Sequence, residues 1–297
     1  MRLKRRSART LALLLALALA LTLCACGAGQ ERSDPAELSF AQRMERSDAL
    51  MQDTKSLHMD MTMDMAMEIR VGENTQRSEM AMATTMDLLN EPLQMAMDMS
   101  VVAGGSRQSL RYYAERNGGG VDLYFSIDDG DHWQKQRVSR LEDVTPQNTE
   151  EQMAMFLACA DSFTETGREE KDGVRLIVYK GELSGAYVEQ AVREAGTLDA
   201  LLQSLGGELP EDLFRDLDPI EVAVEIEEES SRVRSYEMDM SAVMQTLMGR
   251  AMETLAAGMG AEGLATSVTV ERVQIRVEMS RFDELVEIQI PEGAKAG

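Results

Sequence analysis

Hydrophobic and polar residues alternate strictly along residues 58–68, which predicts a β-strand with one apolar face. The segment reads HMDMTMDMAME, so five methionines point to one side and mostly polar residues point to the other. A helix has 3.6 residues per turn and would scatter these methionines around its axis, burying acidic side chains with them. We therefore predict a half-buried strand here, although methionine favours helices.

The same alternation returns several times before residue 139. Turn sequences separate the alternating segments: Asn90-Glu91-Pro92, then Asn-Gly-Gly-Gly at 117–120 and Asp-Asp-Gly-Asp at 128–131. Such short connections join neighbouring strands in antiparallel order. We therefore predict an antiparallel meander with one apolar face and one wet face. Its six strands are 58–68, 80–88, 93–101, 110–114, 121–127 and 133–138.

Helical spacing appears at the start and in the middle of the chain. A first helix is predicted from Asp34 to about Lys55, because Asp34 suits the N-cap and Pro35 suits the first helical position. The other predicted helices are 153–160, 187–205 (broken near Gly196-Thr197) and 244–255. The remaining predicted strands are 174–182, 220–226, 233–240, 267–279 and 285–290.

The apolar positions change phase within the strand 267–279. Val268 and Val270 have even numbers, whereas Val273 and the apolar residues after it have odd numbers. One inserted residue explains the change, so we predict a β-bulge near Glu271. Together these patterns predict an α+β fold: a curved antiparallel half-barrel sheet of about eleven strands, with helices covering its concave face.

Residues 1–26 have the features of a bacterial lipoprotein signal. Five basic residues and no acid precede an apolar run at 11–23, which is short for a membrane span of ~20 residues. The next residues, Cys-Ala-Cys, resemble a lipobox, and Cys26 is a better lipid acceptor than Cys24 because alanine precedes it. A diacylglycerol there would supply the two acyl chains that stable anchoring needs. An uncleaved anchor helix is the alternative.

This reading divides the chain into three parts. Residues 1–25 are predicted to be a signal peptide, 26–33 a lipidated tether, and 34–297 a single ligand-binding domain. We therefore expect an extracytoplasmic protein that a lipidated cysteine anchors to the bacterial cell membrane. With Cys24 removed and Cys26 modified, Cys159 is left without an intrachain disulfide partner.

Composition excludes several classes of function. The formal net charge of −22 argues against nucleic acid as a partner, because binding requires cations that neutralise phosphates. Two histidines and three cysteines are few for hydrolytic metal sites or catalytic triads, and no phosphate-binding loop or zinc-protease motif occurs. The acidic turn 128–131 has oxygen ligands suited to Ca²⁺ but lacks the EF-hand spacing, so we interpret it as a hairpin turn. We predict no enzyme activity, no metal and no cofactor.

The order of elements resembles the LolA/LprG-like group of bacterial envelope lipoproteins. Matching segments are 51–67, 124–138 with its Asp-Gly hairpin and Trp133, 174–183, and the ending 286–295. The resemblance implies a curved, unclosed β-barrel whose concave face is capped by helices. It also implies, from several members of the group, a cavity that holds the acyl chains of lipids or lipoproteins.

The methionine stripe allows three interpretations. It can be ordinary core packing against the helices, a lining for acyl chains or another apolar ligand, or a site for a soft metal such as Cu(I). Alternate residues of one strand lie ~6.6 Å apart, which is wide for several sulfur ligands on one ion. We favour a lipid or apolar small molecule as the partner. The expected lining residues are Met61, Met63, Met65, Met82, Met97, Met244 and Met248.

Two other functions stay open. One is a structural or interaction lipoprotein with a filled core, whose acidic outer face meets a basic partner. The other is a Cu(I) chaperone that uses the methionines.

Overall fold

A computed structural model describes residues 38–139, 149–187, 189, 213–258 and 266–295. The chain divides into two units, Met1–Leu38 and Ser39–Gly297. The description below concerns the second unit. Within the described residues, no helix is both long enough and apolar enough to cross a membrane.

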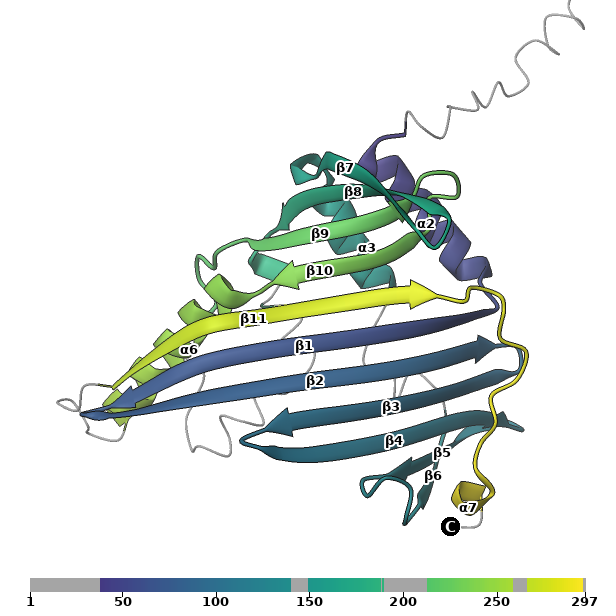
Figure 1. Cartoon of the computed structure of the whole chain (residues 1–297), viewed down its shortest axis with the longest axis horizontal. Coiled ribbons are helices and arrows are strands. Elements are labelled where there is room, and N and C mark those ends of the chain that lie inside the picture. Colours follow the sequence, from purple (N-terminus) through teal and green to yellow (C-terminus); the bar gives the residue numbers. More distant parts are fainter. Residues whose placement is uncertain (1–37, 140–148, 188, 190–212, 259–265, 296–297) are drawn as a thin grey trace, which may run out of the picture. The chain divides into compact units, whose positions relative to one another are not determined.

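One open antiparallel sheet of eleven strands forms the framework (Figure 1). The strand order is β6-β5-β4-β3-β2-β1-β11-β10-β9-β8-β7, so β6 and β7 are the two edges and the sheet does not close. The strands are β1 (Ser56–Val71), β2 (Asn74–Asn90), β3 (Leu93–Ala103), β4 (Ser106–Asn117), β5 (Gly120–Ser126), β6 (Gln134–Val138), β7 (Thr164–Lys171), β8 (Val174–Leu183), β9 (Ile220–Glu227), β10 (Val233–Asp239) and β11 (Thr266–Ser280).

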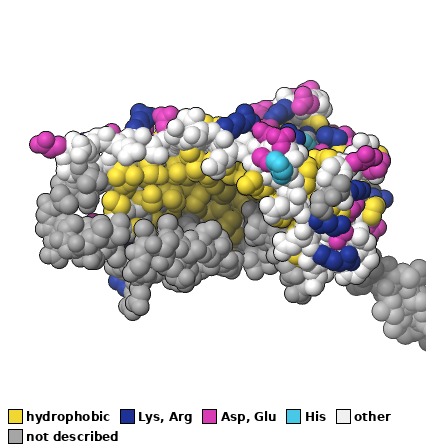
Figure 2. All heavy atoms as spheres, turned by 90° about the horizontal axis from the view of Figure 1, so that it is seen from below, with side chains coloured by type: hydrophobic (Ala, Val, Ile, Leu, Met, Phe, Trp, Pro, Cys, Tyr) yellow, Lys and Arg dark blue, Asp and Glu magenta, His cyan; other side chains and the backbone are white. Residues whose placement is uncertain are grey.

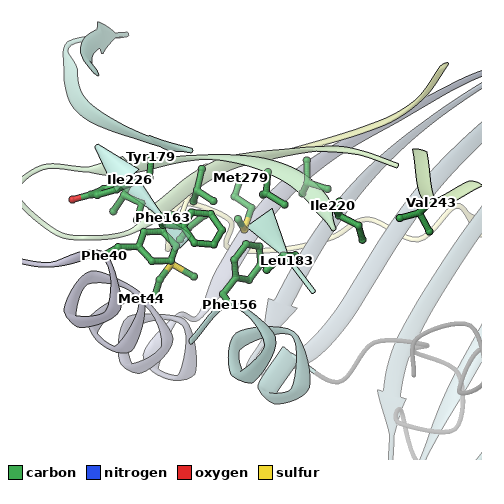
Figure 3. Packing of buried hydrophobic residues seen from close by; sticks show 14 of the residues in the cluster. Phe40, Met44, Phe156, Phe163, Tyr179, Leu183, Ile220, Ile226, Val243 and Met279 are labelled. Carbon is green, nitrogen blue, oxygen red and sulfur yellow. The ribbon is translucent and has the colours of Figure 1, made fainter. Parts of the chain in front are cut away.

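The longer helices pack on one face of this sheet, whereas the short C-terminal helix packs against Tyr124 on the other face. Figure 3 shows α2 and α3 below the strands, with hydrophobic side chains between the two layers. This arrangement confirms the predicted α+β class with an open, curved antiparallel sheet. The helices are α2 (Phe40–Asp53), α3 (Thr149–Ala158), α6 (Ser241–Gly258) and α7 (Glu292–Lys295), with a short 3-10 turn, η3, at Ala160–Ser162.

The predicted six-stranded meander is confirmed as β1 to β6, each paired with the next in the chain. Turn chemistry explains why these strands reverse. Between β3 and β4, Gly104 and Gly105 have φ of 56° and 77°, a left-handed conformation that glycine adopts without strain. Ala103 and Ser106, on either side, are directly paired, so these two glycines form the whole loop.

The predicted bulge in β11 is also confirmed. Ala66 of β1 pairs with Arg272, and the next residue, Met67, pairs with Val270. Glu271 therefore has no partner on β1. The extra residue lets the apolar side chains on both sides of the bulge stay on one face of the sheet.

One predicted boundary and one predicted strand were wrong. The first helix begins at Phe40 and not at Asp34, because Ser39 and Gln42 form a reciprocal capping box there. Asp34 and Pro35 lie outside the described residues. The segment 285–290 is not a strand. Its backbone bonds to side chains instead, for example from the Ile288 amide to Gln94 Oε1 at 3.1 Å.

Ten of the eleven strands were predicted from the hydrophobic pattern. The strand that this pattern does not reveal is β7. Its sequence is TETGREEK, and most of its side chains are exposed at the sheet edge. The turn after it carries a signal: Asp172 and Gly173 have φ of 54° and 78°, typical of a two-residue hairpin loop. The predicted helix 187–205 lies almost entirely outside the described residues.

The main core lies where α2, α3 and α6 meet strands β8 to β11 (Figure 3). The rings of Phe40 and Phe163 stack with centroids 4.1 Å apart. Phe163 also covers Gly181 of β8 so closely that a Cβ there would lie 2.6 Å from the ring. Arg43 of α2 is fully buried and donates hydrogen bonds to the Tyr179 hydroxyl and to backbone and hydroxyl oxygens of the β9–β10 loop.

The other face of the sheet is mostly polar, apart from a small apolar cluster of Tyr124, Ile290 and Ala294, and many of its charges are paired. Arg276 of β11 lies 3.2 Å from Glu237 and 2.8 Å from Glu278. Asp122 of β5 is buried and accepts a hydrogen bond from Asn117, and Lys135 lies 3.2 Å away. These contacts outweigh the burial and hold the pKa of Asp122 below its ordinary value.

Candidate functional site

The apolar face of the sheet carries a group of methionines at its centre. Strand alternation and pairing register place their side chains on the same face, on β1, β2 and β3. We call this group the methionine patch. It consists of Met61, Met63, Met65, Met80, Met82, Met86, Met97 and Met99.

The patch is less covered than the rest of this face. Every one of its methionines is partly exposed. By contrast, the same face of β8 and β9 is closed, because Leu183, Val224 and Ile226 are fully buried beneath the helices. A second buried cluster, which includes Leu93 and Leu123, lies on the other side of the patch. The patch is thus a partly accessible apolar area between two packed regions, and Figure 2 shows hydrophobic side chains gathered on one face of the molecule.

Register brings methionines of different strands directly opposite one another. Met63 faces Met82, Met65 faces Met80, and Met86 faces Met97. Directly opposite residues have Cβ atoms only ~5 Å apart, closer than alternate residues on one strand. Methionine sulfurs on neighbouring strands can therefore lie closer together than those on alternate positions of one strand, which are ~6.6 Å apart.

Two hydroxyl groups on this apolar face are buried without a hydrogen-bond partner among the described residues. Thr84 lies in β2 between Met82 and Met86 and is only 6% exposed. Its Oγ1 is buried and has no hydrogen-bond partner among the described residues. Tyr112 of β4 is the cross-strand neighbour of Met97, and its buried hydroxyl also has no partner. Burial raises the pKa of Tyr112, so this hydroxyl stays protonated and can donate a hydrogen bond.

Five of the seven methionines expected to line a ligand site lie together in the patch: Met61, Met63, Met65, Met82 and Met97. Met244 and Met248 lie on α6, which packs along β11. Met244 packs against the main core, and so does Met61 at the edge of the patch. The lipid acceptor Cys26 lies outside the described residues.

The hydroxyls of Thr84 and Tyr112 were not among the expected site residues. A signal for Thr84 exists in the sequence, because it occupies an apolar-face position between methionines in the alternation of 80–88. The lack of a partner for its hydroxyl depends on the neighbouring strands and has no sequence signature.

A shallow depression of about 260 Å³ lies elsewhere, at the end of α3. Residues of η3 and of the end of β8 line it, together with the free thiol residue Cys159. None of the seven expected methionines contributes to it. It therefore has no connection with the methionine patch.

The acidic and histidine side chains that could bind a metal or a ligand are hydrogen-bonded to one another and to nearby groups. Asp128 accepts hydrogen bonds from the Ser126 hydroxyl at 2.6 Å and from the His132 amide at 3.0 Å, which lower its pKa and order the hairpin turn. His58 on the outer face contacts Asp87 at 2.6 Å and Asp60 at 3.1 Å. Among the side chains that the structure describes, no group of three or more His, Cys, Asp or Glu could hold a metal ion.

Comparison with known sequences gives a family. The model of the DUF6612 family, a family of unknown function, matches residues 41–193, just over half of the chain. The chain belongs to the DUF6612 family. The match covers α2 and the strands β1 to β8, including the whole methionine patch, and ends before β9. No curated protein matches this DUF6612 sequence.

Solved structures similar to this DUF6612 protein include two mycobacterial proteins. Lipoprotein LppX of Mycobacterium tuberculosis has 13% identity and a TM-score of 0.41, with 86% of this chain and 100% of that chain covered. LprF from Mycobacterium bovis has 11% identity and a TM-score of 0.43, with 84% and 96% covered. A putative outer membrane lipoprotein-sorting protein domain from Vibrio parahaemolyticus has 8% identity and a TM-score of 0.17, with 82% and 93% covered. All three TM-scores are below 0.5, so these likenesses carry no argument about function.

Proposed function

We propose that this DUF6612 protein is a non-enzymatic, extracytoplasmic lipoprotein, anchored through Cys26, that binds the acyl chain of a lipid on the methionine patch. The observation that carries the proposal is the difference in burial along one face of the sheet. The part beneath α2 and α3 is closed, whereas the methionines of β1, β2 and β3 stay partly exposed.

The chemistry of the patch suits a flexible apolar ligand. Methionine side chains are unbranched and polarisable, so they adapt to chains of different shape. Each CH₂ group that a lipid buries contributes ~0.8 kcal/mol, so an acyl chain can bind without a specific polar contact. Contiguous apolar side chains that stay partly accessible are a feature of ligand-binding grooves.

Native mass spectrometry of residues 28–297, purified from a bacterial host without detergent, tests the proposal. We expect discrete adducts of lipid mass. Met63→Asp places a charge in the patch and should abolish them, because a carboxylate there would have to be buried with the ligand. Thr62→Asp is the matched control: Thr62 is the preceding residue on the outer face and is exposed, so the adducts should persist. A bare mass for the wild-type protein, with no lipid in organic extracts, contradicts the proposal.

The cross-strand methionine pairs support a second candidate, a Cu(I) site. Thioethers are Cu(I) ligands, and Met86 lies between Met59 on β1 and Met97 on β3. Replacing Met86 and Met97 together with leucine separates the two functions, since leucine keeps the apolar area but removes the sulfur. Cu(I) binding that this double variant abolishes, with no lipid adduct in the wild type, would favour the metal site.

A further inference from the structure

The two unpartnered hydroxyls on the apolar face point to the chemistry of the ligand. Thr84 is a nine-tenths buried polar residue within the methionine patch, and its Oγ1 has no partner among the described residues. A buried hydroxyl without a hydrogen bond is unfavourable, so most native structures supply a partner or place an apolar residue there. Valine, which has nearly the same shape, would avoid the penalty. The hydroxyl is therefore a feature that a bound ligand would explain.

The surroundings of the two hydroxyls restrict the ligand group. The cross-strand neighbours of Thr84 are Met61 and Met99, and neither side chain carries a charge. The neighbours of Tyr112 are Met97 and Phe125, which are also uncharged. Among these described neighbours, a buried carboxylate or phosphate would find no compensating cation. A neutral acceptor would instead be favourable, because both hydroxyls can donate a hydrogen bond.

The positions of the two residues match a lipid that lies across the strands. Thr84 is on β2 and Tyr112 on β4, with β3 between them. Neighbouring strands are ~4.8 Å apart, so the two backbones are separated by roughly 10 Å across the sheet. The tyrosine side chain is long enough to cover much of that gap. The intervening residues on this face, Met97 and Met99, provide an apolar floor for the chain itself.

We infer that the ligand is a neutral lipid with ester-linked acyl chains, and that the hydroxyls of Thr84 and Tyr112 donate hydrogen bonds to its ester carbonyl oxygens. This inference rests on the proposed function, because it assigns a polar subsite within the same patch. The hydrocarbon supplies affinity, whereas the two hydroxyls distinguish an ester from an ether or a free fatty acid.

A competition between two lipids tests the inference. Full-length protein in amphipol is incubated with equal amounts of 1-palmitoylglycerol, which has an ester, and 1-O-hexadecylglycerol, which has an ether. The protein is then isolated again and its lipids are quantified by mass spectrometry, relative to empty amphipol. The wild type should retain the ester in roughly tenfold excess, the factor expected from a net gain of one to two hydrogen bonds. Palmitate, tested alone, should be retained far less than either.

Near-isosteric variants show whether the two hydroxyls cause the preference. In Thr84→Val with Tyr112→Phe the ester-to-ether ratio should fall to about one, while the ether lipid is retained as well as in the wild type. Thr85→Val is the matched control and should keep the wild-type ratio, since Thr85 is exposed on the other face. A wild-type ratio near one, or an unchanged ratio in the double variant, overturns the inference alone. If the wild type retains neither the ester nor the ether lipid, both the inference and the proposed function are overturned.

Discussion

Replacing Thr84 with valine is expected to stabilise the ligand-free protein. Most core substitutions destabilise, so the direction of this effect is diagnostic. Thr84 buries a hydroxyl that has no partner among the described residues, at a position that is 6% exposed. An unsatisfied buried hydroxyl costs about 1–3 kcal/mol, and the methyl group that replaces it adds a small gain from burial.

We expect Thr84→Val to raise the free energy of unfolding by about 1–2 kcal/mol. For a domain of this size that change corresponds to an increase in Tm of about 2–8 °C. Urea denaturation of delipidated protein measures it, and an unchanged m-value shows that the denatured state is unaffected. Thr85→Val corrects for the general preference of strands for valine, because Thr85 is the next residue and is exposed on the other face.

The same measurement with bound ester lipid should give a smaller gain or the opposite sign. The lipid stabilises the wild type through the hydrogen bond that valine cannot donate, and ligand binding adds directly to folding stability. A ligand-free Thr84→Val protein that is less stable than the wild type refutes the reasoning, since it would mean that the hydroxyl is already satisfied.

Three further substitutions test the packing and electrostatics of the sheet. Gly181→Ala should destabilise by about 1–3 kcal/mol in urea denaturation, because its Cβ would lie 2.6 Å from the Phe163 ring, whereas Gly167→Ala, with open space around the new methyl, should be nearly neutral. The pKa of Asp122 is lowered from 3.8 in the folded state, so its contribution to stability is present above that pH and is lost as the pH falls below it. Asp122→Asn should therefore reduce stability by about 1–2 kcal/mol at about pH 7 and by much less at about pH 2, and an equal loss at both would contradict this. Arg43→Met should lower stability by about 2–4 kcal/mol, because it leaves several buried oxygens without a donor, and an unchanged Tm would show that those oxygens find other partners.

Strand positions were predictable wherever one face is apolar and the other polar. The alternation of 58–68 identified β1, and the change of phase near Glu271 identified the bulge in β11, because a period of two leaves a direct trace in the order of residues. An edge strand has no such trace. The segment β7 is exposed on most positions and was missed, although the Asp172-Gly173 turn marks its end.

Apolar alternation also predicted one strand that the structure does not contain. Residues 285–290 alternate, and Ile288 and Ile290 are buried, yet the segment does not join the sheet. Alternation reports which side chains face inward but not whether the backbone has a neighbouring strand. Here the backbone bonds to side chains such as Gln94, a partner nearly two hundred positions away in sequence, which no local pattern can indicate.

The sequence by itself determined the class of the protein: an α+β chain with a methionine-rich apolar sheet face, a polar outer face, and a signal typical of a lipoprotein. These features depend on local periodicity and composition, so the order of residues is sufficient to establish them. Only the tertiary structure decided which part of the apolar face is covered. Pairing of β1 with β11 joins segments that are about two hundred residues apart and places α2 and α3 over one end of the sheet. The methionines of β1 to β3 are left partly exposed, with the unpartnered hydroxyl of Thr84 among them, because burial depends on contacts between distant segments.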